Sequence, residues 1–219
     1  MAHRPERRRK IIKKNLKTLI ITSVVILLPI LLGLLLWNKL PEKIPMHWNT
    51  AGEIDSWASK PFGVFGMPLI MLAFQWLCVL ATGADPKKDN HSTKILHLVL
   101  WIIPVLELVL FAVTYISALG GDVPMDVVMS LFMGLLFVII GNYLPKCQQN
   151  YTIGIKIPWT LNSEENWNRT HRFAGRLWVV CGLVIMVAGC FTFWAVFAML
   201  LPMVLAPFVY SYTLHRKGI

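Results

Sequence analysis

The chain has 219 residues, of which 56% are hydrophobic and 15% charged, and its mean hydropathy is +0.61. One soluble core cannot bury so large an apolar fraction, which excludes an ordinary water-soluble domain and indicates a protein of the lipid bilayer. The formal net charge of +10 does not indicate nucleic-acid binding, because the basic residues lie at the ends of apolar stretches rather than among exposed aromatic residues.

The N-terminal segment is strongly basic, with eight Lys and Arg against one acid, Glu6, in the first 17 residues. The apolar run Leu19–Trp37 that follows is long enough for one membrane span, and no small-residue cleavage site comes after it. We therefore predict a retained first helix, preceded by a basic cytoplasmic arm over residues 1–18. Binding of this arm to an acidic partner or to anionic lipid headgroups is the alternative.

A polar segment, Leu40–Lys60, separates this span from a second one, which is predicted over Phe62–Thr82. The segment combines turn-forming residues with acids, a histidine and two tryptophans, and it is too short to fold by itself. We expect residues 38–61 to form a structured loop that folds against the helices on either side.

Two more spans are predicted over Lys94–Leu119 and Asp126–Leu144, and a second long polar segment follows over Pro145–Arg176. The last apolar block, Leu177–Leu214, has 38 residues, whereas one span needs roughly 20. It should therefore form two helices, joined by a turn near Gly189–Phe193.

The count of six spans agrees with the charge distribution, because 18 of the 21 Lys and Arg residues then fall on one side of the membrane. The positive-inside rule places that side in the cytoplasm, together with both termini and residues 145–176, and it places the loop 38–61 outside. The predicted fold class is an all-α membrane protein with six transmembrane helices. We divide it into a two-helix module over residues 19–93 and a four-helix module over residues 94–219.

The cytoplasmic segment contains two local patterns. Three isoleucines between residues 153 and 157 alternate with other residues, which is the period of an extended strand, and Pro158 ends it. Asn162, followed three residues later by Glu165, then predicts a helix start. One face of that helix carries, at helical spacing, Trp167, Thr170, His171 and Ala174. An interfacial helix explains the tryptophan but not the extended hairpin before it.

Gln75 lies within the second predicted span, and Glu107 lies near the middle of the third. An ionisable side chain in lipid is costly and is a functional candidate for that reason. Glu107, with Gln75 as a partner, therefore motivates an alternative function, a small proton-coupled transporter or carrier. A protonated Glu107 that is hydrogen-bonded to another helix is the structural explanation of the same residue.

The two polar segments together resemble a known family. The stretch LPEKIPMHWNTAGEIDSWASK resembles the signature of the N-terminal module of SdpI-family membrane proteins, and GNYLPKCQQNYTIGIKIPWTLNSEENWNRTHRFAGRLWV resembles that of their C-terminal module. With the spans between them, the resemblance covers roughly residues 18–200, and two long motifs in the right order are more specific than either alone. The chain departs from the family at Lys156–Ile157, where Arg–Thr is common.

This resemblance implies a multi-pass immunity protein of the bacterial cytoplasmic membrane, which protects the producing cell from a secreted killing peptide that collapses the membrane potential. The best-known member of the family also senses that peptide and holds a small transcriptional repressor at the membrane. The resemblance implies no enzyme, and the sequence contains no catalytic motif of the hydrolase, metalloprotease or phosphate-loop kind. We therefore expect no catalytic residue, no cofactor and no metal site.

Two sets of candidate site residues follow. For the extracellular loop we expect contact with the toxin through His47, Trp48, Asn49, Glu53, Asp55, Trp57 and Lys60. For the cytoplasmic loop we expect docking of a soluble partner through Lys156, Trp159, Trp167, Arg169, His171 and Arg172. The structural alternative for the first set is a compact cap, because Asn and Asp side chains commonly satisfy the backbone of turns.

Overall fold

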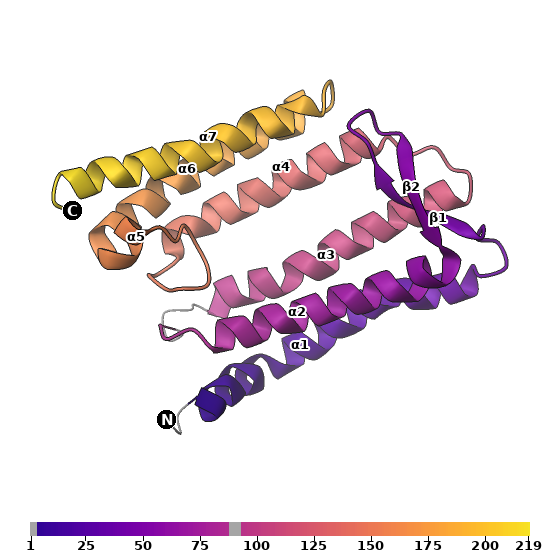
Figure 1. Ribbon diagram of the computed structural model, residues 1–219, viewed down its shortest axis with the longest axis horizontal. Coiled ribbons are helices and arrows are strands. Elements are labelled where there is room, and N and C mark those ends of the chain that lie inside the picture. The colour runs from indigo at the N-terminus through magenta and orange to yellow at the C-terminus, as the bar shows by residue number, and fades with distance from the viewer. Residues whose placement is uncertain (1–3, 88–92) are drawn as a thin grey trace. The chain divides into compact units, whose positions relative to one another are not determined.

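The computed structural model describes residues 4–87 and 93–219, with side chains described for residues 15–87 and 94–219 (Figure 1). Most side chains of the predicted basic arm therefore lie outside the described residues. The chain forms two compact units. The N-terminal unit comprises Met1–Ala84 and Leu96–Met125, and the C-terminal unit comprises Asp85–Ile95 and Asp126–Ile219. In this grouping the third long helix belongs with the first two.

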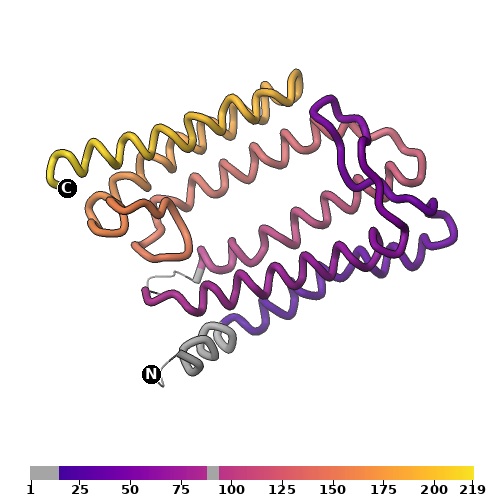
Figure 2. The backbone as a smooth tube through the Cα atoms, viewed as in Figure 1, coloured from indigo at the N-terminus to yellow at the C-terminus, as the bar shows by residue number. Residues whose placement is uncertain are grey.

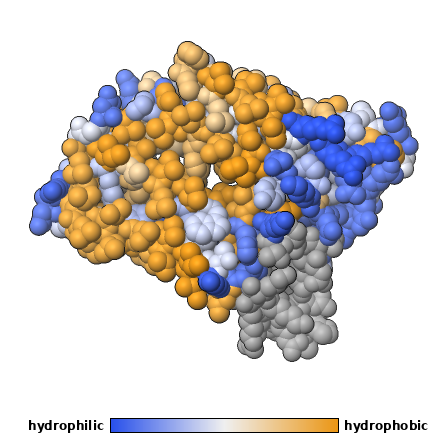
Figure 3. Space-filling model, turned by 180° about the vertical axis from the view of Figure 1, so that it is seen from behind, coloured by the Kyte–Doolittle hydropathy of each residue, from blue (hydrophilic) through white to orange (hydrophobic). Residues whose placement is uncertain are grey.

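Six helices in the described part of the chain are long and apolar enough to cross a membrane, which confirms the predicted number of spans. They are α1 (Arg4–Leu35), α2 (Met67–Gly83), α3 (Thr93–Ala118), α4 (Met125–Tyr143), α6 (Glu164–Ala188) and α7 (Trp194–Arg216). The turn between α6 and α7 lies where the sequence placed it and carries the exposed Cys190. On the face that Figure 3 shows, most of the surface is apolar, and hydrophilic residues gather in patches away from its middle.

The segment between α1 and α2 is a β-hairpin. The fold was predicted to be all-α, and it is mostly rather than entirely helical. Strands β1 (Lys43–Trp48) and β2 (Ile54–Ser59) pair antiparallel, and the five-residue π-helix η1 (Phe62–Gly66) leads from β2 into α2. The hairpin lies at the end of the N-terminal unit where α1 ends and α2 begins (Figure 2). Irregular pairing around His47 interrupts the alternation of apolar and polar residues, which is why the sequence shows no strand there.

The hairpin rests on a hydrophobic cluster that joins it to the helices of its unit. The cluster consists of Leu40, Ile44, Val64, Phe111 and Tyr115, and all five are buried. The Tyr115 hydroxyl also donates a hydrogen bond of 2.9 Å to the Pro29 carbonyl of α1. A Cβ at Gly33 would lie 2.6 Å from that hydroxyl oxygen, so glycine is what permits this contact.

In the C-terminal unit, glycines bring α4 and α6 into close contact. A Cβ built on Gly134 would lie 2.6 Å from the Gly182 carbonyl oxygen, and one built on Gly141 would lie 2.8 Å from that of Gly175. The glycines on each helix are seven residues apart, which places them on one face. An apolar cluster of α4, α6 and α7 residues surrounds this contact and includes Phe137, Cys181, Ile185, Val196 and Met203.

The segment between α4 and α6 differs from its prediction. It begins with the 3-10 helix η3 (Leu144–Lys146), and residues 153–157 form bends and extended backbone without a strand partner, so the predicted strand hairpin is wrong. A short helix, α5 (Pro158–Asn162), follows. Helix α6 begins at Glu164, and its cap is Ser163 rather than Asn162, because the Ser163 hydroxyl accepts a hydrogen bond from the Asn166 amide.

Candidate functional site

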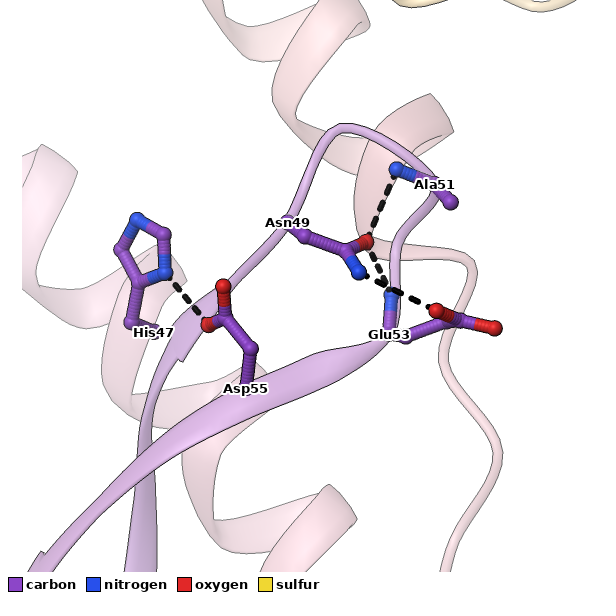
Figure 4. A network of polar contacts seen from close by, with 5 residues as sticks. All are labelled: His47, Asn49, Ala51, Glu53 and Asp55. Carbon is purple, nitrogen blue, oxygen red and sulfur yellow. Dashed lines mark hydrogen bonds and ion pairs between the residues drawn. The ribbon is translucent and has the colours of Figure 1, made fainter.

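The tip of the hairpin is held by its own polar side chains (Figure 4). The Asn49 side-chain oxygen accepts hydrogen bonds from the backbone amides of Ala51 (2.9 Å) and Glu53 (3.1 Å). The Asn49 amide group donates to the Glu53 carboxylate at 3.1 Å. Gly52 supplies the left-handed backbone conformation, with φ of 80°, that completes the turn. The hairpin therefore presents a defined surface rather than a loose loop.

An exposed imidazole–carboxylate pair lies on the strands below this turn. His47 Nδ1 and Asp55 Oδ1 are 2.5 Å apart, and 66% and 43% of the two side chains are exposed. Trp57 follows on β2 and is 53% exposed, while Trp48 is half-buried. An indole ring and carboxylates thus stand together on one exposed hairpin, a combination that suits an amphipathic ligand.

Lys60, which the sequence grouped with these residues, has a different position. It is buried, and its ammonium group donates to the Glu42 carboxylate at 3.0 Å and to the Trp37 carbonyl at 3.4 Å. The same ammonium lies 5.3 Å from the centre of the Trp37 ring. Lys60 therefore ties the base of the hairpin to the end of α1.

In the C-terminal unit, Trp167 and His171 are buried and fix the loop that precedes α5. Trp167 Nε1 donates to the Cys147 carbonyl at 2.7 Å, and the two rings stack with their centres 4.0 Å apart. His171 Nδ1 lies 2.8 Å from the Trp167 carbonyl, while its Nε2 accepts from the Ile155 amide at 2.9 Å. We call Trp167 and His171, with the loop backbone they hold, the ring clamp.

Gly154 lets the loop reach the ring clamp. Its φ is +114°, and a Cβ there would lie 2.5 Å from His171 Nε2 and 3.1 Å from the Trp167 ring. Burial raises the pKa of the neighbouring Cys147 thiol to about 11, so this thiol stays protonated and unreactive at neutral pH.

Two further residues that the sequence analysis missed complete the loop. The buried Asn150 accepts hydrogen bonds from the Thr152 and Ile153 amides at 2.8 and 2.7 Å. The Asp85 carboxylate, from the segment before α3, accepts from the Tyr151 amide at 2.9 Å and from the Thr152 hydroxyl. Asn and Asp side chains often accept hydrogen bonds from the backbone of turns, and this preference could have marked both residues as structural. It could not have shown that Asp85 contacts residues more than 60 positions away in the sequence.

The other predicted docking residues lie around the outside of this structure. Trp159 is half-buried and packs on three rings of α7, those of Phe208, Tyr212 and His215. Arg169 is exposed and pairs with Glu165 at 2.5 Å. Lys156 and Arg172 are exposed as well. The predicted docking residues thus divide into buried residues that shape the loop, Trp167 and His171, and residues that lie at its surface.

Gln75 and Glu107 do not form the pair that the sequence suggested. The Gln75 amide group donates instead to the Thr22 hydroxyl at 2.7 Å. Glu107 is buried, and neither of its carboxyl oxygens has a hydrogen-bond partner in the part of the chain that the structure describes. In the same part of the chain, no three His, Cys, Asp or Glu side chains gather as a metal site would require.

Comparison with known proteins places these features in a family. The model of the SdpI/YfhL protein family matches residues 146–211, and that of a domain of unknown function, DUF1648, matches residues 24–72. The chain is 31% identical over 199 residues to the Immunity protein SdpI of Bacillus subtilis (strain 168), an alignment that covers 91% of this chain and 92% of that protein. The chain belongs to the SdpI/YfhL family. In this SdpI/YfhL-family chain, the ring clamp falls inside the first matched region and the hairpin inside the second. No solved structure matches it.

Proposed function

We propose that this chain is an immunity protein of the bacterial cytoplasmic membrane, which protects the cell that makes it from a secreted peptide that depolarises membranes. The observation that carries the proposal is the 31% identity to an immunity protein over 91% of the chain. The six apolar helices are what such a membrane protein requires.

The proposed orientation puts the hairpin outside the cell and residues 145–176 in the cytoplasm. It is supported by the charge bias, since all but 3 of the 21 Lys and Arg residues then lie inside. In this orientation the hairpin is the first structured surface that a secreted peptide meets.

The exposed face of the hairpin is the proposed contact surface for the peptide. Trp57 supplies apolar area, and Glu53 and Asp55 supply negative charge, on a hairpin whose turn is fixed by Asn49. A rigid surface loses little conformational entropy when it binds. His47 and Trp48 lie beside these residues on β1, and Lys60 holds the hairpin in place from below.

The outer residues of the cytoplasmic loop are proposed to dock a soluble partner, such as a small transcriptional repressor. Lys156 and Arg172 are exposed cations, and the half-buried Trp159 adds an aromatic ring near the end of α7. Such a surface suits an acidic partner. A pull-down tests this part: recovery of the partner should fall with Arg172→Ala and Lys156→Ala together, and unchanged recovery would remove this surface from docking.

Membrane depolarisation in a sensitive bacterium tests the main proposal. Cells that express the wild-type chain should keep their membrane potential when challenged with a purified killing peptide of this class. Cells with Trp57→Ala or Asp55→Ala, at matched abundance in the membrane, should lose it. Thr50→Ala, an exposed change at the same turn, is the control and should protect fully.

The outcomes separate the two parts of the proposal. Loss of potential in the wild type across a panel of such peptides would overturn the immunity function. Full protection by both Trp57→Ala and Asp55→Ala would leave immunity standing and remove the hairpin as the contact surface.

A further inference from the structure

The interior of the N-terminal unit contains polar atoms that no protein group satisfies. Gln75 on α2 is 1% exposed, and its amide group donates to the Thr22 hydroxyl of α1 at 2.7 Å. Its carbonyl oxygen, Oε1, has no hydrogen-bond partner among the described residues. A buried acceptor without a partner is costly and usually indicates an ordered water or a ligand.

Glu107 on α3 is a second buried side chain with polar atoms that lack a hydrogen-bond partner among the described residues. It is 2% exposed, and both of its carboxyl oxygens are without a partner among the described residues. Leu100, seven residues earlier, packs with Leu19 of α1 and Val79 of α2, and Phe111, four residues later, belongs to the cluster under the hairpin. Helical periodicity therefore puts Glu107 on the face of α3 that meets α1 and α2.

A small cavity lies on the same face, one turn before Glu107. Its volume is about 30 Å³, and its lining includes Gln75 and Thr82 of α2, Asn15 of α1 and Ile103 of α3. A water needs roughly 10–15 Å³ of such volume and two or more polar partners. The cavity meets the volume requirement, and the polar residues in its lining are Gln75, Thr82 and Asn15.

The helix stretches around Glu107 provide no Lys or Arg to balance an ionised carboxylate, since Lys17 lies in the N-terminal half of α1 and Lys94 lies at the start of α3. Helix α1 has no ionisable residue between Lys17 and its end, and the only ionisable side chain of α2 is that of Cys78. On α3, His97 contacts Thr18 at 3.5 Å, and Tyr115 donates to the Pro29 carbonyl. An ionised carboxylate without a counter-charge at this depth is far more costly than a neutral acid.

We propose that Glu107 is a proton-binding site inside the N-terminal unit, and that its protonated carboxyl group donates a hydrogen bond to a buried water, which in turn donates to Gln75 Oε1. The proton comes from bulk water and stays on the carboxyl group. This arrangement gives the acid proton an acceptor and gives Gln75 Oε1 a donor. The inference concerns the helices alone and is independent of the proposed immunity function.

Infrared spectroscopy of the full chain in lipid nanodiscs, with glutamate labelled by ¹³C at the carboxyl carbon, tests the proposal. A protonated carboxyl group has a C=O band that is absent from ionised carboxylates. The other glutamates whose side chains are described are exposed to solvent, namely Glu42, Glu53, Glu164 and Glu165. At pH 7 we expect one acid band, which shifts to lower frequency with the label and again in D₂O.

Three variants assign the band. Glu107→Gln should remove it, whereas Glu42→Gln, a change at an exposed acid, should leave it unchanged. Gln75→Leu should keep the band but raise its frequency, because the hydrogen-bonded water is lost.

Absence of a protonated glutamate band from the labelled wild type at pH 7 would overturn the proposal, and this result does not depend on whether any variant folds. Persistence of the band in a folded Glu107→Gln would overturn the assignment. An unchanged frequency in Gln75→Leu would overturn the water link.

Discussion

His171 Nε2 accepts a hydrogen bond of 2.9 Å from the backbone amide of Ile155, although 16 residues separate them in the sequence. Since His171 Nδ1 faces the Trp167 carbonyl of its own helix, the imidazole has to be neutral, with its proton on Nδ1, to make both contacts. One side chain therefore connects the first turns of α6 to a loop that has no regular secondary structure of its own.

Replacing His171 by Ala should destabilise the C-terminal unit by about 2 kcal/mol or more. The Ile155 amide would lose its acceptor, and an unsatisfied buried amide alone costs roughly 1–3 kcal/mol. Thermal unfolding in detergent measures the change. Arg172→Ala, at the exposed neighbouring position, should stay within about 0.5 kcal/mol; equal losses for both variants would contradict a structural role for the imidazole.

Gly154→Ala should be more harmful than Gly218→Ala, although both glycines have positive φ, of 114° and 81°. At Gly218 no atom lies within 4 Å of the added Cβ, so only the backbone conformation is strained, at a cost of about 1–2 kcal/mol. At Gly154 the Cβ would also collide with His171 Nε2. Differential scanning calorimetry of the two variants separates these effects. Similar melting temperatures would show that the loop can move and relieve the collision with His171.

Gly182→Ala should loosen the contact between α4 and α6, because the new methyl group would lie 2.6 Å from the Gly134 carbonyl oxygen. Overpacking of this kind typically costs about 1–3 kcal/mol. Unfolding by SDS titration measures it. Leu183→Ala, at the adjacent position that is 51% exposed, is the control; a larger loss at Leu183 would mean that the glycine contact does not limit stability.

Lys60→Met should release the base of the hairpin more than Glu42→Gln does. The Lys60 side chain is 9% exposed, whereas that of Glu42 is 91% exposed. The ion pair itself is therefore screened and worth at most about 1 kcal/mol, but the buried ammonium also serves the Trp37 carbonyl and ring. Amide hydrogen exchange of β1 should accelerate several-fold in Lys60→Met and little in Glu42→Gln. The reverse order would show that the carboxylate holds the hairpin.

The six spans could be predicted from the sequence because they depend on the length of apolar runs alone. The turn near residues 189–193 was predictable for the same reason. The face that carries Trp167 and His171 was also visible, since helical periodicity is a local property, and both residues are buried.

What the local pattern could not show was the set of partners for these side chains. The alternation of Ile153, Ile155 and Ile157 indicated a strand, but their segment is held by His171, Asn150 and Thr160 instead of by a neighbouring strand. Conversely, the hairpin at residues 43–59 was not predicted as strands, because irregular pairing at His47 disturbs its period. The first error arises where side-chain hydrogen bonds replace a regular ladder, and the second arises where the ladder itself is irregular.

The four free cysteines differ in accessibility: Cys190 in the turn between α6 and α7 is exposed, Cys147 and Cys181 are buried, and Cys78 is half-buried within α2. Cys190 can therefore report which side of the membrane the turn between α6 and α7 faces, without any added label site. A membrane-impermeant maleimide added to intact cells should modify Cys190 if that turn faces the exterior, as the proposed orientation requires, and Cys190→Ser should abolish the modification. Labelling only after the cells are broken would reverse the orientation and place the hairpin inside the cell.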